Sequence, residues 1–394
     1  MWGSTCIPRK VYQGLYPLKR HFRCAQGQHF LVCCWWLMAL IRDPGKGTLK
    51  GLKPYLPPTL KYWTTLRMIQ SRQWDAKAVV CTMATGTLRA LPPPGDGVLY
   101  LIGDSTLKDK RGRKHPLGHT TRHSEHDPYT FGFEMGLLIA SWGRGRVPVA
   151  FGLMDPTIKG HQNIHFRQML KDFVPPSWVR QIVVVADAGF AANAPLRLIA
   201  DKHYTYVFAM PRTRKFTDGK HLRDLVQHLP KSCYYRRASS KPDGRRQDYW
   251  VFTRRATLHK LGDVTIVLSK KRRNHGPKGV KIIVTNLTEA SAGAILSIYA
   301  WRWGMEVTIK ELKSGLHLGQ MQVTKDKERV TRSVALSVLA SLLLVRLYGR
   351  AELSTQAWSL FKLKERFMGE VAQDAMWRTE RKWQSKLKQF KNVA

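Results

Sequence analysis

Two short, continuously apolar stretches, each followed by an aspartate, constrain the fold more than any other feature. Residues 98–103 read VLYLIG and lead into Asp104, and residues 182–186 read IVVVA and lead into Asp187. Such runs are typical of strands buried on both faces of an α/β sheet. Ligands meet such sheets at the carboxyl ends of the strands, so both aspartates are candidate site residues. A cap or turn role is the alternative for each aspartate, and Asp187 could cap a helix over residues 191–200.

A third group of candidates lies on a helix that we expect over residues 298–316, IYAWRWGMEVTIKELKSGL. At about 100° per residue, one stripe of this helix carries a phenol, a guanidinium, a carboxylate and an ammonium group. These residues are Tyr299, Arg302, Glu306 and Lys313, with Lys310 close to the stripe. A solvated face of mixed charge is the alternative, because Arg–Glu pairs four residues apart are common on surface helices. The two aspartates upstream favour a site.

The spacing Tyr-x2-Arg-x3-Glu-x6-Lys resembles the signature of insertion-sequence DDE transposases. The motifs Asp-x-Thr at Asp104 and Asp-x-Gly-Phe at Asp187 resemble those around the two catalytic aspartates of the same family. The resemblance spans about residues 95–345 and implies an RNase H-like fold, a mixed five-stranded sheet flanked by helices. It also implies that Asp104, Asp187 and Glu306 are catalytic carboxylates that bind metal.

The resemblance implies a DNA transposase that cleaves the ends of its element and transfers the 3' hydroxyl into target DNA. The implied cofactor is Mg²⁺ or Mn²⁺, as two ions, because carboxylate oxygens suit these hard cations. The implied partners are double-stranded transposon ends, target DNA and a second copy of the chain. The implied contacts to the DNA backbone come from Tyr299, Arg302, Lys310 and Lys313. A stand-alone RNase H-like nuclease and a catalytically silent, domesticated DNA-binding protein are the alternatives.

The charge of the chain indicates the same class of partner independently. Its 394 residues include 66 lysines and arginines against 27 aspartates and glutamates, a formal net charge of +39. Such an excess in a chain with 43% hydrophobic residues indicates a globular protein that binds a polyanion. A chromatin or ribosomal protein would also be basic, so charge predicts the partner and not the chemistry.

The cysteines and the apolar segments indicate a reducing, cytoplasmic compartment, with association to the nucleoid through DNA. The six cysteines show no Cys-x2-Cys pair, so a structural zinc site is not expected. They are also too few for a disulfide scaffold. The apolar run at residues 30–41 is too short to span a bilayer, and we expect no membrane association.

The chain divides into five predicted segments. We expect a helical DNA-end-binding domain over residues 1–95, with helices at 30–41, 59–73 and 76–90, although a subdomain that only packs on the core is equally compatible. The core follows in two parts, 96–210 with both aspartates and 286–350 with the glutamate helix. A β-rich insertion (211–285) separates them, and a basic helical tail (351–394) ends the chain.

The first part of the core is predicted to contain the strand order of an RNase H-like sheet. Strands are expected at residues 132–142 and 147–153, joined by a hairpin at Gly143-Arg144-Gly145-Arg146. Helices at 161–173 and 194–203 and a strand at 204–210 complete it.

The resemblance implies that the insertion helps to hold the transposon end. Alternating, aromatic-rich segments at residues 232–237, 247–253, 264–269 and 281–285 indicate strands. The predicted phosphate contacts are Arg245, Arg246, Arg254, Arg255, Lys270, Lys271, Arg272 and Arg273. Tyr234, Tyr235, Tyr249 and Trp250 are candidate stacking platforms, with ordinary packing as the alternative.

The basic segment 108–126, which includes His115, His119, His123 and His126, is predicted to hold phosphates or to be a solvated loop.

Overall fold

The computed structural model describes residues 7–22, 28–45, 47–70, 73–110, 112, 114–121, 129–321, 326–353 and 359–391. The chain forms two compact units. One, here called the α/β unit, is Pro92–Ile309, and the other, the helical unit, combines Met1–Leu91 with Lys310–Ala394. The division into domains at residues 95, 210, 285 and 350 stays a prediction.

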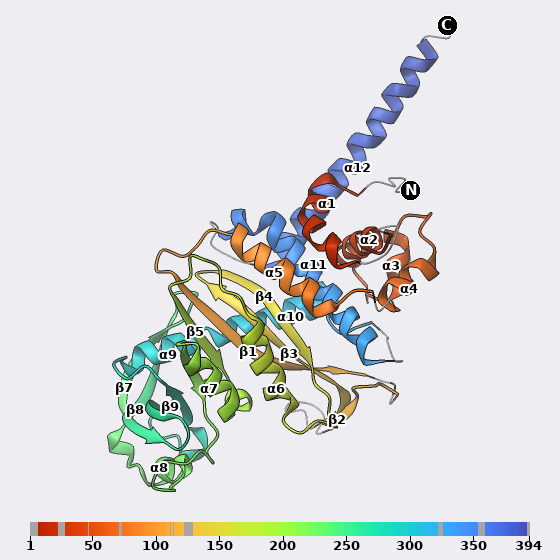
Figure 1. Cartoon of the computed structure of the whole chain (residues 1–394). Coiled ribbons are helices and arrows are strands. Elements are labelled where there is room, and N and C mark those ends of the chain that lie inside the picture. The colour runs from red at the N-terminus through yellow and green to blue at the C-terminus, as the bar shows by residue number, and fades with distance from the viewer. Residues whose placement is uncertain are drawn as a thin grey trace. The chain divides into compact units, whose positions relative to one another are not determined.

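The α/β unit is organised around one mixed sheet, which has ten strands within the described residues, in the order β2-β3-β1-β5-β6-β10-β9-β8-β7 with β4 on β3 (Figure 1). The strands are β1 (Val98–Asp109), β2 (His119–Thr121), β3 (Thr130–Trp142), β4 (Gly145–Leu153), β5 (Gln181–Ala186), β6 (Thr205–Ala209), β7 (Tyr235–Ser240), β8 (Arg246–Leu258), β9 (Gly262–Lys270) and β10 (Lys281–Thr285). The predicted mixed α/β sheet is therefore confirmed. The insertion extends this sheet instead of forming a separate one.

The core half of the sheet has parallel strands at its centre. The runs predicted as buried strands are β1 and β5, which pair in parallel from Val98↔Gln181 to Gly103↔Ala186, and β6 pairs in parallel with β5. The hairpin β3–β4 turns at Gly143, whose φ of 48° is in the left-handed region that glycine tolerates best. Strand β1 is longer than its apolar run because its second half pairs with β3 through Asp109↔Gly132.

Helices cover both faces of this core. Helices α6 (His161–Asp172) and α7 (Asn193–Asp201) pack on each other, and α6 packs on β3 and β4. A Cβ on Gly103 would lie 2.3 Å from the ring of Phe166 in α6. The next residue of β1, Asp104, contacts Arg302, and successive residues of a strand point to opposite faces. Helix α6 and Arg302 therefore lie on opposite faces of β1.

The helix predicted as continuous over residues 298–316 is interrupted, which corrects that expectation. Helix α9 (Ala292–Ala300) ends before Trp301, and α10 (Arg302–Gly315) begins after it. At the break the hydrogen bonds close over three residues, from Trp301 N–H to the Ile298 carbonyl and from Gly304 N–H to the Trp301 carbonyl. The Trp301 ring stacks on Tyr100 of β1, with 4.3 Å between ring centroids. This stacking fixes the break against the sheet.

The helical unit contains α1 (Arg9–Leu15), α2 (Gln28–Arg42), α3 (Leu49–Leu52), α4 (Tyr62–Gln70), α5 (Ala76–Ala90), α11 (Lys327–Leu353), α12 (Leu360–Lys391) and the last turns of α10. The helices predicted in the first 95 residues are confirmed as α2, α4 and α5, with α4 shorter than expected. Asp75 caps α5 by accepting the N–H groups of Lys77 and Ala78.

Among the described residues, α11 is the one helix long and apolar enough to cross a membrane by length and composition. Its most apolar window is 83% buried, and α11 packs against α1, α2, α4, α5 and α12 of its own unit. These contacts are those of the core helix of a helical bundle.

Candidate active site

Asp104 and Asp187 are neighbours because their strands are neighbours. Gly103 of β1 and Ala186 of β5 form the last parallel pair, and the two aspartates follow directly. The Asp104 side chain is 13% exposed, and its carboxylate accepts the Ser105 N–H at 2.9 Å. The parallel register therefore places two carboxylates at one edge of the sheet.

Asp187 also has the turn role that its position suggested as an alternative. Its carboxylate accepts the Gly189 N–H at 2.9 Å and so caps a short 3-10 turn, Ala188–Phe190. It does not cap α7, where Ala192 is the N-cap residue. One carboxylate oxygen is thus fixed by the backbone, which orients Asp187 at the end of β5.

Glu306 reaches the same edge from α10, through Arg302. The Arg302 guanidinium donates to Asp104 Oδ2 at 2.8 Å and to Glu306 Oε1 one turn further along α10. The Arg302 side chain is 22% exposed and Glu306 is 37% exposed. Arg302, expected to bind phosphates of DNA, therefore contacts two of the three candidate carboxylates in this structure.

The electrostatics of the three carboxylates are coupled. Burial raises the pKa of Asp104 to about 6, Arg302 opposes this rise, and the charges of Asp187 and Glu306 add to it. Burial also raises the pKa of the Tyr299 phenol to about 12, again against the attraction of Arg302. The carboxylates are thus close enough to repel one another, and Arg302 supplies the opposing charge.

Lys281 is a residue of this site that the sequence did not reveal. It is the first residue of β10, which runs antiparallel to β6, so β10 begins at the edge where the parallel strands end. Its ammonium lies 5.0 Å from the centroid of the Tyr299 ring. Partial burial and the charge of Arg302 lower the pKa of Lys281, whereas Glu306 and Asp187 raise it. A lysine before an apolar run at the start of an antiparallel strand is the signal that could have identified it.

The carboxylate oxygens at this edge are of the chemical type that binds divalent cations. Carboxylate oxygens suit Mg²⁺ and Mn²⁺, and desolvated like charges are relieved by a cation. Within the described residues, however, no three His, Cys, Asp or Glu side chains are gathered closely enough to hold one ion. The Arg302 guanidinium bonds to both Asp104 and Glu306.

The remaining signature residues divide between the two units. Tyr299 ends α9 in the α/β unit, next to Arg302, whereas Lys310 and Lys313 belong to the part of α10 in the helical unit. The roles of Lys310 and Lys313 in DNA binding stay predictions.

The predicted phosphate contacts of the insertion differ in their surroundings. Arg245 pairs with Asp243, and Arg255 pairs with Glu289 at 2.8 Å. Three others lie over aromatic rings: Arg254 over Phe216, Lys270 over Tyr234 and Arg273 over Trp250. Lys270 is only 3% exposed, which argues against a direct phosphate contact. Arg246, Lys271 and Arg272 have no ion pair or ring contact within the described residues.

The candidate stacking platforms differ in exposure, and the structure describes only part of the basic segment. Tyr234 is buried and Tyr235 is 40% exposed, whereas Tyr249 and Trp250 are half-buried. In the basic segment, His115 stacks on Phe133, with 4.7 Å between centroids, and burial lowers the pKa of His115 to about 4. His119 lies on β2, whereas His123 and His126 lie outside the described residues.

Comparisons with known proteins give one family and one fold. A family described as "Transposase DDE domain group 1" matches residues 152–375, a stretch that contains Asp187 and Glu306 and begins after Asp104. A cryo-EM structure of a piggyBac transposase synaptic complex with hairpin DNA is similar in fold. Its TM-score is 0.50 at 9% sequence identity, over 96% of this chain and 80% of that chain. No curated protein matches the chain.

Proposed function

From the premise that the chain belongs to the transposase DDE domain group 1 family, we propose that it catalyses cut-and-paste transposition of an insertion sequence. The proposed reaction hydrolyses a phosphodiester at each transposon end and then transfers the exposed 3' hydroxyl into target DNA. One phosphodiester is broken and another formed in the transfer, so no nucleotide cofactor is required.

One observation carries this proposal: three carboxylates from separate segments of the chain lie near one another, so that the charges of Asp187 and Glu306 raise the pKa of Asp104. Asp104 lies within β1, just after its last parallel pair with β5, Asp187 follows β5, and Glu306 bonds to the arginine that also bonds to Asp104. Surface ion pairs do not gather carboxylates in this way, because like charges repel. The arrangement supports the roles proposed for Asp104, Asp187 and Glu306 as catalytic, metal-binding residues.

These carboxylates would hold the proposed Mg²⁺ or Mn²⁺, and the bound ions would activate the attacking oxygen and stabilise the leaving oxygen. The other residues of the site act on the DNA. Lys281 would contact the phosphate with its ammonium, and Arg302 would contact it once released from the carboxylates. Tyr299, whose phenol stays protonated, would donate a hydrogen bond to the DNA backbone.

We propose double-stranded transposon ends and target DNA as the partners, bound by a homodimer. The net charge of +39 supports a polyanionic partner, and the structure similar in fold is a synaptic complex with hairpin DNA. Association with the nucleoid of the cytoplasm follows from the same proposal.

Cleavage and strand transfer on a labelled duplex that carries the element's own end, with Mg²⁺, test this function. The parent should cut and join the end, and Glu306→Gln should bind the DNA without doing either. Asp172→Asn, which changes an exposed carboxylate of α6 in the same unit, is the matched control and should act like the parent.

Other outcomes would replace the proposal. Cutting without any joined product would indicate the stand-alone nuclease. DNA binding by the parent without cutting would indicate the silent DNA-binding protein. Activity retained by Glu306→Gln would return Glu306 to the status of a solvated helix residue.

A further inference from the structure

Helix α4 exposes two aromatic rings on the surface of the helical unit. Trp63 is 66% exposed and Tyr62 is 47% exposed, and their rings meet edge to face with 5.4 Å between centroids. Exposing large aromatic side chains to water is unfavourable in free energy, so an exposed pair of them usually marks a binding surface. Thr65, Met68 and Ile69 are the buried residues of the helix, which packs against α2 and α11, and Trp63 lies on the face away from them. Most of the Trp63 side chain and about half of Tyr62 therefore remain outside the packing of α4.

Positive charge surrounds these rings. Lys61 precedes Tyr62, and Arg67 lies one helical turn after Trp63, and both side chains are exposed. Lys61, Tyr62, Trp63 and Arg67 are called the α4 surface below. Lys50 in α3 and Lys53, which follows α3 directly, are exposed as well.

No carboxylate opposes this charge along the same stretch of chain. Between Asp43 and Asp75 the sequence contains no aspartate or glutamate. Asp43 is 3% exposed and accepts the N–H groups of Gly45 and Gly47, and Asp75 is engaged in capping α5. The cations of the α4 surface are thus available for an anionic partner, in contrast to the paired arginines of the insertion.

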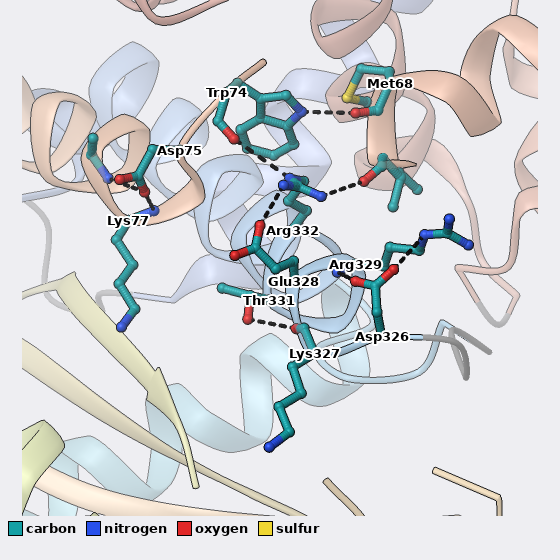
Figure 2. Close-up of polar contacts among 12 residues, drawn as sticks. Met68, Trp74, Asp75, Lys77, Asp326, Lys327, Glu328, Arg329, Thr331 and Arg332 are labelled. Atoms are coloured by element: carbon teal, nitrogen blue, oxygen red, sulfur yellow. Dashed lines mark hydrogen bonds and ion pairs between the residues drawn. The ribbon is translucent and has the colours of Figure 1, made fainter. Parts of the chain in front are cut away.

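Hydrogen bonds hold the carboxyl end of α4, the end of the helix at which Arg67 lies. Figure 2 shows the Trp74 indole N–H donating to the Met68 carbonyl, at 2.8 Å, and the guanidinium of Arg332 at the same helix end. Arg332, only 3% exposed, donates to the Ile69 carbonyl at 3.2 Å and to Glu328 at 2.6 Å. A cation and an indole donor here satisfy carbonyls that a helix end leaves without partners. A rigid helix loses little conformational entropy when its side chains bind a partner.

We propose that the α4 surface binds a DNA strand with unpaired bases, stacking them on Trp63 and Tyr62 while Lys61 and Arg67 contact the phosphates. Aromatic rings among cations are the usual means of binding single strands, whereas the bases of a closed duplex already stack on each other. A second copy of this chain would bring a like net charge of +39 to the surface. The identity of the partner as DNA rests on the proposed function, but the surface lies outside the unit that holds the carboxylates.

Binding of the full-length protein to a mixed-sequence single-stranded oligonucleotide, and to the blunt duplex of the same sequence, tests the proposal. Trp63→Ala should weaken binding of the single strand by about fivefold to a hundredfold and that of the duplex less, because base stacking is lost. Trp63→Phe should retain most of the affinity. Arg67→Gln should weaken both complexes and reduce the dependence of affinity on salt, because a phosphate contact is lost.

Tyr16→Ala is the matched control. Tyr16 is 53% exposed in the same unit and has the Lys19 ammonium 5.7 Å from its ring centroid, so it is another exposed aromatic beside a lysine. Its binding should equal that of the parent. Equal losses in Tyr16→Ala and Trp63→Ala, or parent-like binding by Trp63→Ala, would overturn the proposal. A change of oligomeric state in Trp63→Ala on sedimentation, with DNA affinity unchanged, would also overturn it and identify a protein interface.

The two proposals fail separately. If the parent does not cleave transposon ends, the transposase function fails, but the comparison of Trp63→Ala with Tyr16→Ala still decides the α4 surface. If the parent cleaves and Trp63→Ala binds both probes like the parent, the surface fails alone.

Discussion

The cations in the two halves of the sheet differ in the role proposed for their partners. At the carboxylate edge, Arg302 is bound to Asp104 and Glu306, and Lys281 lies against Tyr299, so these cations interact with residues of the proposed site. In the insertion, the arginines mostly meet a local carboxylate or ring, as Arg255 meets Glu289. The presence of a basic residue alone therefore does not predict its role. The partner of that residue determines whether its substitution should change catalysis, stability or DNA binding.

The largest effect is expected at the carboxylate edge itself. Asp187→Asn should reduce strand cleavage by about a thousandfold or more, because a neutral amide removes one of the proposed metal-binding charges. The amide oxygen can still accept the Gly189 N–H, so the 3-10 turn and the fold should persist, which circular dichroism would verify. Cleavage at the parent rate would show that Asp187 acts only as the cap of that turn.

Arg302→Gln should lower the stability of the metal-free protein by about 1–3 kcal/mol, because three carboxylates then lose their opposing charge. Thermal unfolding with and without Mg²⁺ measures this effect. Mg²⁺ should stabilise the variant more than the parent, since a divalent cation supplies the missing charge. Arg255→Gln, which breaks an exposed pair, is the control and should leave thermal unfolding unchanged. Equal behaviour of the two variants would remove the distinction between the two regions.

Lys281→Gln should slow cleavage by about tenfold at saturating DNA, because a charge-assisted contact to the phosphate is lost. Single-turnover rates separate this effect from the affinity for DNA. Lys281→Arg should recover part of the rate. Lys278→Gln changes an exposed lysine just before β10 and should keep the parent rate. A loss in Lys278→Gln as large as that in Lys281→Gln would indicate a general effect of charge.

The smallest effects are expected in the insertion. Arg246→Gln should reduce the slope of log affinity against log salt by about 0.9 if it removes one phosphate contact, with a modest loss of affinity. Arg245→Gln, whose guanidinium is already bonded to Asp243, should change the slope less. Titration of DNA binding at several salt concentrations makes the comparison. A larger change for Arg245→Gln would mean that DNA displaces its partner carboxylate.

The sequence was sufficient to predict the strands and carboxylates because each has a local signal. Apolar runs predicted β1 and β5, and the residues that follow those runs are Asp104 and Asp187, which the parallel pairing brings together. The periodicity around Glu306 predicted a helix that lies at the same edge. In each case a short stretch of chain determines the property.

The features that the sequence did not predict depend on distant contacts. The helical periodicity continues through Trp301, whereas the helix breaks there and the Trp301 ring stacks on Tyr100, about two hundred positions earlier in the chain. The position of Lys281 depends on the direction of β10, which is set by pairing with β6 and not by the residues of β10. The contact of Arg302 with Asp104 joins residues almost two hundred positions apart, 198 in all, and no spacing rule reaches that far.

The pairing of β10 has a consequence for attempts to shorten or recombine the chain. This strand bonds to the core strand β6 on one side and to the insertion strand β9 on the other. Residues 211–280 thus cannot be deleted as a module without leaving one ladder of β10 unpaired at a new sheet edge. Chimaeras that exchange the insertion between relatives should keep β9 and β10 from the same parent, because these two strands share five consecutive paired positions, from Lys281↔Ser269 to Thr285↔Thr265.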